Sequence, residues 1–446
     1  MSGALGLVLP ETDPGIAEPL LRRIGERIEA AGRAGLGAWL MDDLWTVGRD
    51  TSTCPARTDA AVETTAALTR LVSLFPDLTG FIIRFGEPLE SPRHWVARRD
   101  PLACDCPDCS RIDVDERRRQ IVRFAEQVIC VDLSKNCILR LWDLGAEGAH
   151  ADVSRARAML QAWRGDGRLM VALKHTQTDH WRYQPWNPSI REVAPPCLIE
   201  LQCEREYELL GLVPNWLGRH WAFGPDECGE KGVTGFHDDL PEDWAGVYVL
   251  PRGGGWSKPH ADSDIWAELN TTTALALAAD PMVDPDDILA DWLLGRGLPS
   301  EFHDLLGDSA ERMLALRYPK VWTDLSGSLW MPAENWFRDD TFVPGALATM
   351  ASRIVEAGLT DRFLAERATV TLMTGEDETR VRDLIPQNHP DTEFIRSSYR
   401  FMHSFAAWTE ALWTALLAAA PLDRAAAADI VSLRLENQPL PPFRLL

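Results

Sequence analysis

Short apolar runs alternate with amphipathic helical patterns through the first 280 residues, and this alternation limits the possible folds more than any other feature. Eight such runs lie at residues 5–9, 37–41, 80–85, 137–142, 169–174, 197–201, 220–223 and 245–250. Nearly continuous apolar character is typical of strands that are buried on both faces of a parallel sheet. Eight strand–helix units predict an α/β fold, a (β/α)8 TIM barrel, with a doubly wound open sheet as the alternative.

Helical patterns separate these runs and then continue without strands. Segment 19–34 places Ile24 and Ile28 on one side and charged residues on the other, and similar patterns cover 60–74, 116–130, 153–163 and 207–219. Further helices are expected at 264–279, 285–294, 309–316, 345–357, 361–375 and 397–420. Asp284 followed by Pro285 is a typical helix start. We therefore predict a catalytic barrel at residues 1–280 and an α-helical C-terminal domain at residues 281–446.

Net charge and cysteine content indicate which binding partners are disfavoured and which cellular compartment is expected. The chain has 45 Lys+Arg against 67 Asp+Glu, a net charge of −22, which repels nucleic acid and anionic membranes. No apolar run approaches the roughly 18 residues that span a bilayer, and the start of the chain lacks a secretory signal pattern. Nine scattered cysteines suggest a reducing compartment, so we expect a cytoplasmic protein. The 18 tryptophans suit stacking on sugar rings, but they equally suit core packing.

Polar side chains stand at the ends of several predicted strands, where the loops of a barrel build the active site. Glycosidic cleavage needs a carboxylic acid and a second carboxylate, and Glu87, Asp179 and Glu206 are the candidates. Nearby cations suited to a substrate carboxylate are Arg84, Arg140 and Lys174. The alternative is that these charges pair with one another and stabilise the barrel mouth. His175, next to Lys174, is a substrate contact or a hydrogen-bonded structural residue.

Two stretches of the sequence resemble the α-glucuronidases of glycoside hydrolase family 67. They are VALKHTQTDHW with IELQCEREYELLGLVPNW, and WAGVYVLPRGGGW with DSDIWAELNTTTALALAADP. The resemblance covers about residues 30–295. It implies that the paired carboxylates Asp179 and Glu206 activate water, that Glu87 is the acid, and that the three cations bind the uronate. It also implies substrate-binding positions at Trp266 and Asn270. Trp181, two residues after Asp179, is a further candidate for substrate binding.

The resemblance further implies an inverting mechanism, in which acid and base stand roughly 6.5–9.5 Å apart. The sequence departs from the family in two respects. The family's usual N-terminal domain is lacking before the first predicted strand. The loops after Glu87 and around residues 181–196 also differ, and these loops would shape the sugar pocket.

Three cysteines, Cys104, Cys106 and Cys109, lie within six residues. Three thiols at this spacing suit a zinc ion, but no second ligand pair follows at the usual distance. A loop-shaping role is the favoured interpretation, and a metal site or a labile disulfide are the alternatives. No cofactor is expected.

These features together predict a glycosidase, exo-acting and inverting, that removes a uronic acid of the α-glucuronic type or a related sugar. The alternatives are a non-catalytic carbohydrate-binding barrel, a glycosidase acting on a neutral sugar, and a lyase or isomerase with Lys174 as base. The expected partner is an oligosaccharide substrate, with no nucleic acid and no membrane, and a homodimer is left open.

Overall fold

The computed structural model of the 446-residue chain describes most of the sequence. The described residues are 5–8, 13–43, 46–47, 58–85, 97–98, 102, 107–141, 148–177, 186–193, 195–205, 208–224, 235–238, 240, 244–251, 263–327, 336–338, 341–437 and 444–445. The chain divides into two compact units. The sheet unit comprises residues 1–179, 187–200 and 240–248, and the helical unit comprises 180–186, 201–239 and 249–446. The domain boundary predicted at residue 280 stays a prediction.

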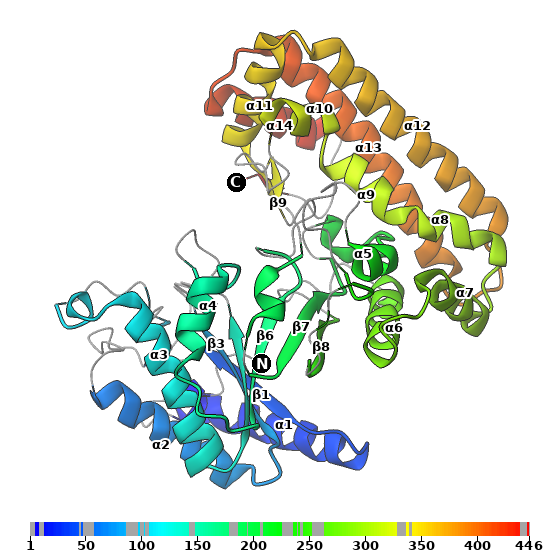
Figure 1. The fold of residues 1–446 in the computed structure, drawn as a ribbon. Helices are drawn as coiled ribbons and strands as arrows, with labels where there is room; N and C mark the ends of the chain where they lie inside the picture. The colour runs from blue at the N-terminus through cyan, green and yellow to red at the C-terminus, as the bar shows by residue number, and fades with distance from the viewer. Residues whose placement is uncertain are drawn as a thin grey trace. The chain divides into compact units, whose positions relative to one another are not determined.

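Six parallel strands form one sheet, in the order β1-β3-β5-β6-β7-β8 (Figure 1). They are β1 (Trp39–Asp43), β3 (Gly80–Phe85), β5 (Asn136–Leu141), β6 (Leu169–Lys174), β7 (Cys197–Gln202) and β8 (Gly246–Leu250). The amide of Ala245 donates to the Cys197 carbonyl and that of Cys203 to the Leu250 carbonyl, so β8 runs parallel to β7. This chain-ordered arrangement is what successive strand–helix units produce, and it corresponds to part of a barrel wall.

Residues alternate between the two faces of the sheet. One face, which we call the inner face, carries a small apolar cluster made of Ile82, Ile138, Ala172 and Leu198, with Trp39, Met41, Met170 and Tyr248 packed against it. The opposite face is wholly apolar at the same level, with Phe81, Ile83, Leu139, Val171 and Ile199 buried. Burial of both faces explains why the strands read as continuous apolar runs.

Four helices accompany the strands of the sheet unit: α1 (Pro14–Arg33), α2 (Thr58–Leu74), α3 (Val114–Phe124) and α4 (Val153–Leu160) (Figure 1). The Asp13 carboxylate accepts the amide of Gly15 and starts α1, which buries Ile24 and Ile28 as its period predicts. Helix α3 continues into a π-helical segment, η3 (Ala125–Asp132). Shorter elements are η1 (Leu5–Val8), β2 (Thr46–Val47), β4 (Ala97–Arg98), η2 (Cys109–Arg111) and η4 (Pro188–Arg191).

Two of the eight predicted strands are wrong. Residues 5–8 form the 3₁₀ helix η1, whose first amide donates to the Asp42 carboxylate, and residues 220–223 belong to helix α5 (Gly218–Phe223). Both runs are only four or five residues long, and at that length apolar character does not separate a strand from a buried helical turn. The parallel α/β sheet followed by helices is confirmed, whereas the described residues contain six of the eight strands that a closed barrel requires.

The helical unit contains two long helices, α12 (Thr360–Leu384) and α13 (Thr392–Ala419), which run side by side (Figure 1). Its other helices are η5 (Leu209–Gly211), α5, α6 (Ile265–Ala279), α7 (Pro285–Arg296), η7 (Ser300–Phe302), α8 (His303–Gly307), α9 (Ser309–Arg317), α10 (Lys320–Ser326), α11 (Pro344–Glu356) and α14 (Arg424–Asn437). Three two-residue strands, β9 (Phe337–Arg338), β10 (Thr341–Phe342) and β11 (Arg444–Leu445), form a small sheet. The predicted cap is present, since the Asp284 carboxylate accepts the amide of Asp286 at the start of α7.

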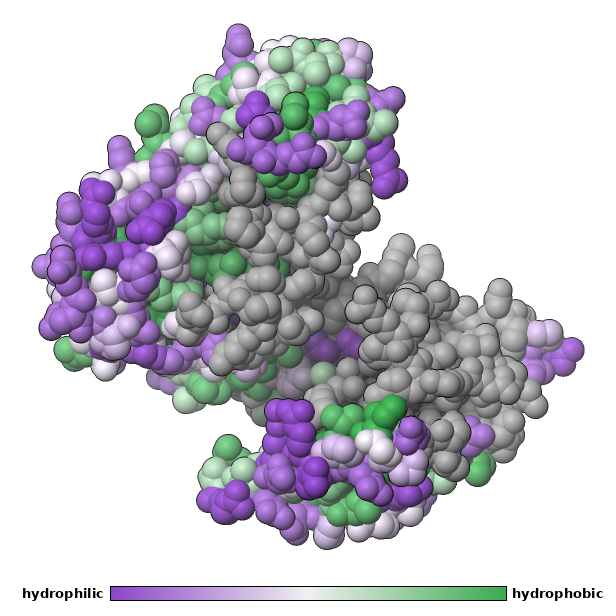
Figure 2. Space-filling view, turned by 180° about the vertical axis from the view of Figure 1, so that it is seen from behind, coloured by the Kyte–Doolittle hydropathy of each residue, from purple (hydrophilic) through white to green (hydrophobic). Residues whose placement is uncertain are grey.

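Tryptophan fills much of the core of the helical unit. Nine of the 18 tryptophans are buried among the described residues, and Trp336, Trp413 and Phe363 form a chain of edge-to-face contacts. The core-packing alternative therefore accounts for half of the indole rings. Seen from behind, hydrophilic side chains cover most of the coloured surface (Figure 2). Within the described part of the chain, none of the helices combines the length and the apolar character that crossing a bilayer demands.

The predicted helix at 207–219 is also wrong over most of its length. Backbone φ angles are positive at Arg205, Leu209, Leu210 and Gly211, and only the short η5 forms there. A left-handed backbone cannot continue a right-handed helix. Pro214 follows three residues later, and regular helix resumes only at α5.

Candidate active site

Four charged side chains stand on the inner face at the carboxyl edge of the sheet. Each lies two residues beyond a member of the apolar cluster: Arg84 after Ile82, Arg140 after Ile138, Lys174 after Ala172 and Glu200 after Leu198. A spacing of two residues returns a strand to the same face. The strand register aligns Arg84 with Arg140 and Lys174 with Glu200. Three cations and one carboxylate thus share the edge at which barrels bind their substrates.

Glu200 pairs with Arg140 through both oxygens. The Arg140 Nε and Nη2 atoms each donate to a different Glu200 oxygen at 2.7 Å, and both side chains are almost fully buried. The Lys174 Nζ atom lies 3.9 Å from the same carboxylate. The register places Ala172 of β6 beside Arg140, and its methyl group leaves space for the guanidinium to reach across that strand. The Arg140 and Glu200 side chains together span two interstrand spacings, about 9–10 Å, to make this contact.

Tyr248 and Met41 complete this cluster. The Arg140 guanidinium lies 5.6 Å from the centre of the Tyr248 ring, and the Tyr248 hydroxyl donates to the Met41 sulfur at 3.6 Å. Burial raises the pKa of the Tyr248 hydroxyl, while the charges of Arg140 and Arg84 partly oppose this. Tyr248 is therefore a neutral hydrogen-bonding group rather than a base. Sequence reasoning did not select Tyr248 or Glu200 as site residues, although a lone carboxylate in the apolar run CLIELQ was a signal for Glu200.

The structure brings together Arg84, Arg140 and Lys174 from the predicted substrate-binding set. His175 follows on the other face of β6, is buried, and its Nδ1 atom lies 3.4 Å from the Glu200 carbonyl oxygen. Glu87, Asp179, Glu206 and Trp181 lie outside the described residues, and so do Cys104 and Cys106. Cys109 is buried. Among the residues that the structure describes, no group of three or more His, Cys, Asp or Glu side chains could hold a metal ion.

Asn270 and Trp266 are fully engaged inside the helical unit. The Asn270 amide donates to the carbonyls of Cys203 and Asn215, and its oxygen accepts the Leu217 amide. The Trp266 indole donates to Ser398 and packs edge-on against Tyr399. These contacts favour structural roles for both residues, with Asn270 fixing the chain just beyond β7.

The chain beyond β7 is tightly held in the helical unit. Arg205 has φ +60°, and its guanidinium donates to both oxygens of Glu208 at 2.6 Å. Asn215 donates to the same carboxylate at 3.2 Å. Left-handed backbone at a non-glycine residue costs free energy and tends to persist where surrounding contacts enforce it, often near functional sites. Glu206 lies between Arg205 and Glu208 in the sequence.

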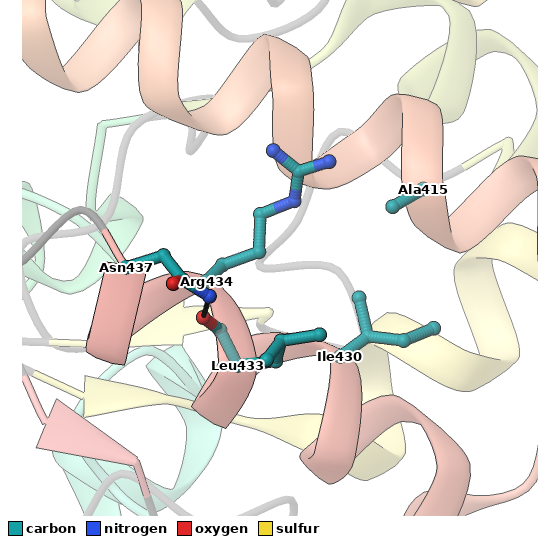
Figure 3. Close-up of a pocket in the computed structure, with 5 residues that line it drawn as sticks. All are labelled: Ala415, Ile430, Leu433, Arg434 and Asn437. Carbon is teal, nitrogen blue, oxygen red and sulfur yellow. Dashed lines mark hydrogen bonds between the residues drawn. The ribbon is translucent and has the colours of Figure 1, made fainter.

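Two cavities lie elsewhere in the described parts of the units. One, of about 320 Å³, lies between α13 and α14 and is lined by Ala415, Ile430, Leu433, Arg434 and Asn437 (Figure 3). None of these described lining residues carries a carboxylate. The other, of about 450 Å³, lies beside η3, where both oxygens of the Glu126 carboxylate accept amides of the chain before β6. Neither lies at the carboxyl edge of the sheet.

A curled parallel sheet with charged residues at its carboxyl edge, followed by helices, defines a TIM-like α/β protein. Two solved glycoside hydrolases align with this chain. A glycoside hydrolase of family 138 that targets pectin rhamnogalacturonan II aligns with a TM-score of 0.50 at 10% identity, over 96% of this chain and 65% of its own. A mutant O-GlcNAc hydrolase from Thermobaculum terrenum aligns with a TM-score of 0.43 at 13% identity, over 95% of this chain and 83% of its own.

The fold therefore resembles that of glycoside hydrolases, and this chain spans about two thirds of the length of the family 138 enzyme. No protein-family model matches the sequence, so the resemblance to family 67 is not supported at the level of a family. No curated protein sequence matches it either.

Proposed function

We propose that this chain is a glycoside hydrolase, exo-acting and inverting, that removes a uronic acid of the α-glucuronic type from an oligosaccharide. The observation that supports the substrate class is the group Arg84, Arg140 and Lys174 on the inner face of the sheet. These three positive charges face the single negative charge of Glu200, and the excess of positive charge suits a substrate that carries a carboxylate. Guanidinium groups can bind a carboxylate through two parallel hydrogen bonds, which also orients the sugar ring.

The assignment of catalytic roles rests on the sequence. Glu87 is the proposed acid that protonates the leaving oxygen, and Asp179 with Glu206 is the proposed pair that activates water. In a parallel sheet, residues just past the carboxyl ends of strands face the same edge as Lys174 and Glu200. All three proposed carboxylates follow the strands β3, β6 and β7 within a few residues.

A panel of uronic and neutral oligosaccharides and aryl glycosides, followed by proton NMR, tests this proposal. Release of a uronic acid as the inverted anomer is the expected result, because an inverting enzyme delivers water to the opposite face of the ring. Release of a neutral sugar alone would reassign the substrate. Binding of uronic acids with no turnover of any substrate would identify a carbohydrate-binding protein instead.

Variants separate catalysis from binding in the same assay. Asp179→Asn and Glu206→Gln are each expected to lose most turnover while the free energy of unfolding changes little. Asp286→Asn, which alters an exposed carboxylate of the helical unit, is the control and should keep wild-type turnover. Full turnover in either of the first two variants contradicts the proposed roles.

A further inference from the structure

The chain just beyond β6 is held by two buried polar side chains, Asn187 and His150. Three successive carbonyl oxygens are engaged. The Lys174 oxygen accepts the Asn187 side-chain amide at 3.3 Å, the His175 oxygen accepts the Asn187 main-chain amide at 2.7 Å, and the Thr176 oxygen lies 3.0 Å from His150 Nε2. Pairing of β6 with β7 ends at Lys174 and Glu200, so the sheet no longer supplies these partners.

Asn187 uses both ends of its amide in this arrangement. Its nitrogen also donates to the His150 carbonyl at 3.0 Å, and its oxygen accepts the Ser189 amide at 3.0 Å at the start of η4. Asn187 and His150 are both completely buried. These buried hydrogen bonds resist movement, because moving Asn187 or His150 would leave carbonyl oxygens without these partners in a medium of low dielectric.

This network includes the main chain of Lys174, a residue of the candidate site. The Lys174 carbonyl accepts the Asn187 side-chain amide, and the Lys174 ammonium lies 3.9 Å from Glu200.

We propose that Asn187 and His150 are positioning residues, which fix the end of β6 so that the Lys174 ammonium meets the carboxylate of the substrate. This inference rests on the proposed function for the role of Lys174. The structural part of the proposal, that Asn187 fixes the position of the Lys174 ammonium, does not depend on the identity of the sugar. A displacement of a substrate-binding group by about an ångström can lower the reaction rate by about a hundredfold.

The structural part, that Asn187 fixes the Lys174 ammonium, is tested by NMR of the full chain labelled with ¹⁵N at lysine side chains. The chain has only five lysines, and Lys174→Met assigns the Lys174 ammonium signal. Asn187→Asp keeps the size and the acceptor for Ser189 but removes both donated hydrogen bonds. It is expected to shift or broaden the Lys174 signal and leave the other four unchanged.

Ser189→Ala is the matched control, because the Ser189 hydroxyl lies in the same turn and has no hydrogen-bond partner within the described structure. It should leave all five signals unchanged. If Asn187→Asp does not fold, Asn187→Ser replaces it, since serine retains an acceptor for the Ser189 amide. An unchanged Lys174 signal in a folded Asn187 variant overturns the proposal.

The functional part is tested with 4-nitrophenyl α-D-glucuronide in a double-mutant cycle. Asn187→Asp should raise KM by about tenfold in the presence of Lys174, and by less than about twofold in the Lys174→Met background. A merely structural role predicts equal effects in both backgrounds, and that result overturns the proposal. If the wild-type protein neither binds nor cleaves the glucuronide, the proposed function fails, while the NMR result still decides whether Asn187 controls Lys174.

Discussion

Arg140 on β5 and Glu200 on β7 form a bidentate, buried ion pair that crosses the strand between them. The pair lies on the inner face of the sheet, with Lys174 beside it. It links two strands that are not neighbours in the sheet, and it partly balances the positive charge of the candidate site.

Glu200→Gln should destabilise the protein by about 3–5 kcal/mol, because it removes the charge that faces the buried Arg140 guanidinium and the Lys174 ammonium. Urea unfolding measures the change. Asp286→Asn, which breaks the exposed pair with Arg219, is the control and should cost less than about 1 kcal/mol. Equal costs in the two variants would mean that the Arg140 pair contributes no more than a surface pair.

Gly211→Ala should be strongly destabilising. Gly211 has φ +67°, and an added Cβ atom would lie 2.2 Å from the Glu204 carbonyl oxygen. Gly327 has the same φ, and no described atom would lie within 4 Å of an added Cβ atom there, so Gly327→Ala should cost only the roughly 1–2 kcal/mol of left-handed backbone. We expect Gly211→Ala to lose at least about 2 kcal/mol more in thermal or urea unfolding, and similar losses would argue against the clash.

Asn270→Asp should destabilise the helical unit by about 3 kcal/mol, because a carboxylate cannot donate to the buried Cys203 and Asn215 carbonyls. The control is Asn437→Asp, which removes a similar bond to Leu433 on the exposed end of α14 and should change the free energy of unfolding little (Figure 3). Retention of wild-type stability in Asn270→Asp would refute the structural role of Asn270.

Cys203 should make stability depend on pH under alkaline conditions. Burial raises the pKa of its thiol from 9.0 to about 12, although a hydrogen bond with Thr271 and the charge of Arg205 act against this. Between pH 9 and 12 the unfolded chain therefore loses this proton while the folded protein keeps it, so stability falls as pH rises.

The comparison that isolates this effect is the wild-type protein against Cys203→Ala. Over that pH interval the wild-type protein should lose up to about 4 kcal/mol more than Cys203→Ala, since one pKa unit corresponds to about 1.4 kcal/mol. Parallel pH profiles for the two proteins in urea unfolding would show that the thiol does not contribute.

The sequence was sufficient to predict the strands that are buried on both faces of the sheet. Runs such as Leu169–Lys174 and Cys197–Gln202 are apolar except for one or two polar residues near their carboxyl ends, and no solvent-exposed face interrupts them. The helices α7 and α13 were likewise expected, from the cap at Asp284 and from a long amphipathic period. The apolar runs at residues 5–9 and 220–223 were misread, because four or five residues are too few to show a period.

Residue type and strand position also determined that charged side chains would gather at the carboxyl edge of the sheet. Arg84, Arg140 and Lys174 were expected there, and the alternation of strand residues placed them on one face. Which of these charges pair with which was decided only by the tertiary structure. The contact of Arg140 with Glu200 depends on the order of the strands and on the small side chain of Ala172 between them. The engagement of Asn270 with the chain beyond β7 depends in the same way on residues more than fifty positions apart. A local pattern records the preference of each residue for a strand, a helix or a face, whereas the partner of a buried polar group is chosen by the packing of segments distant in the sequence.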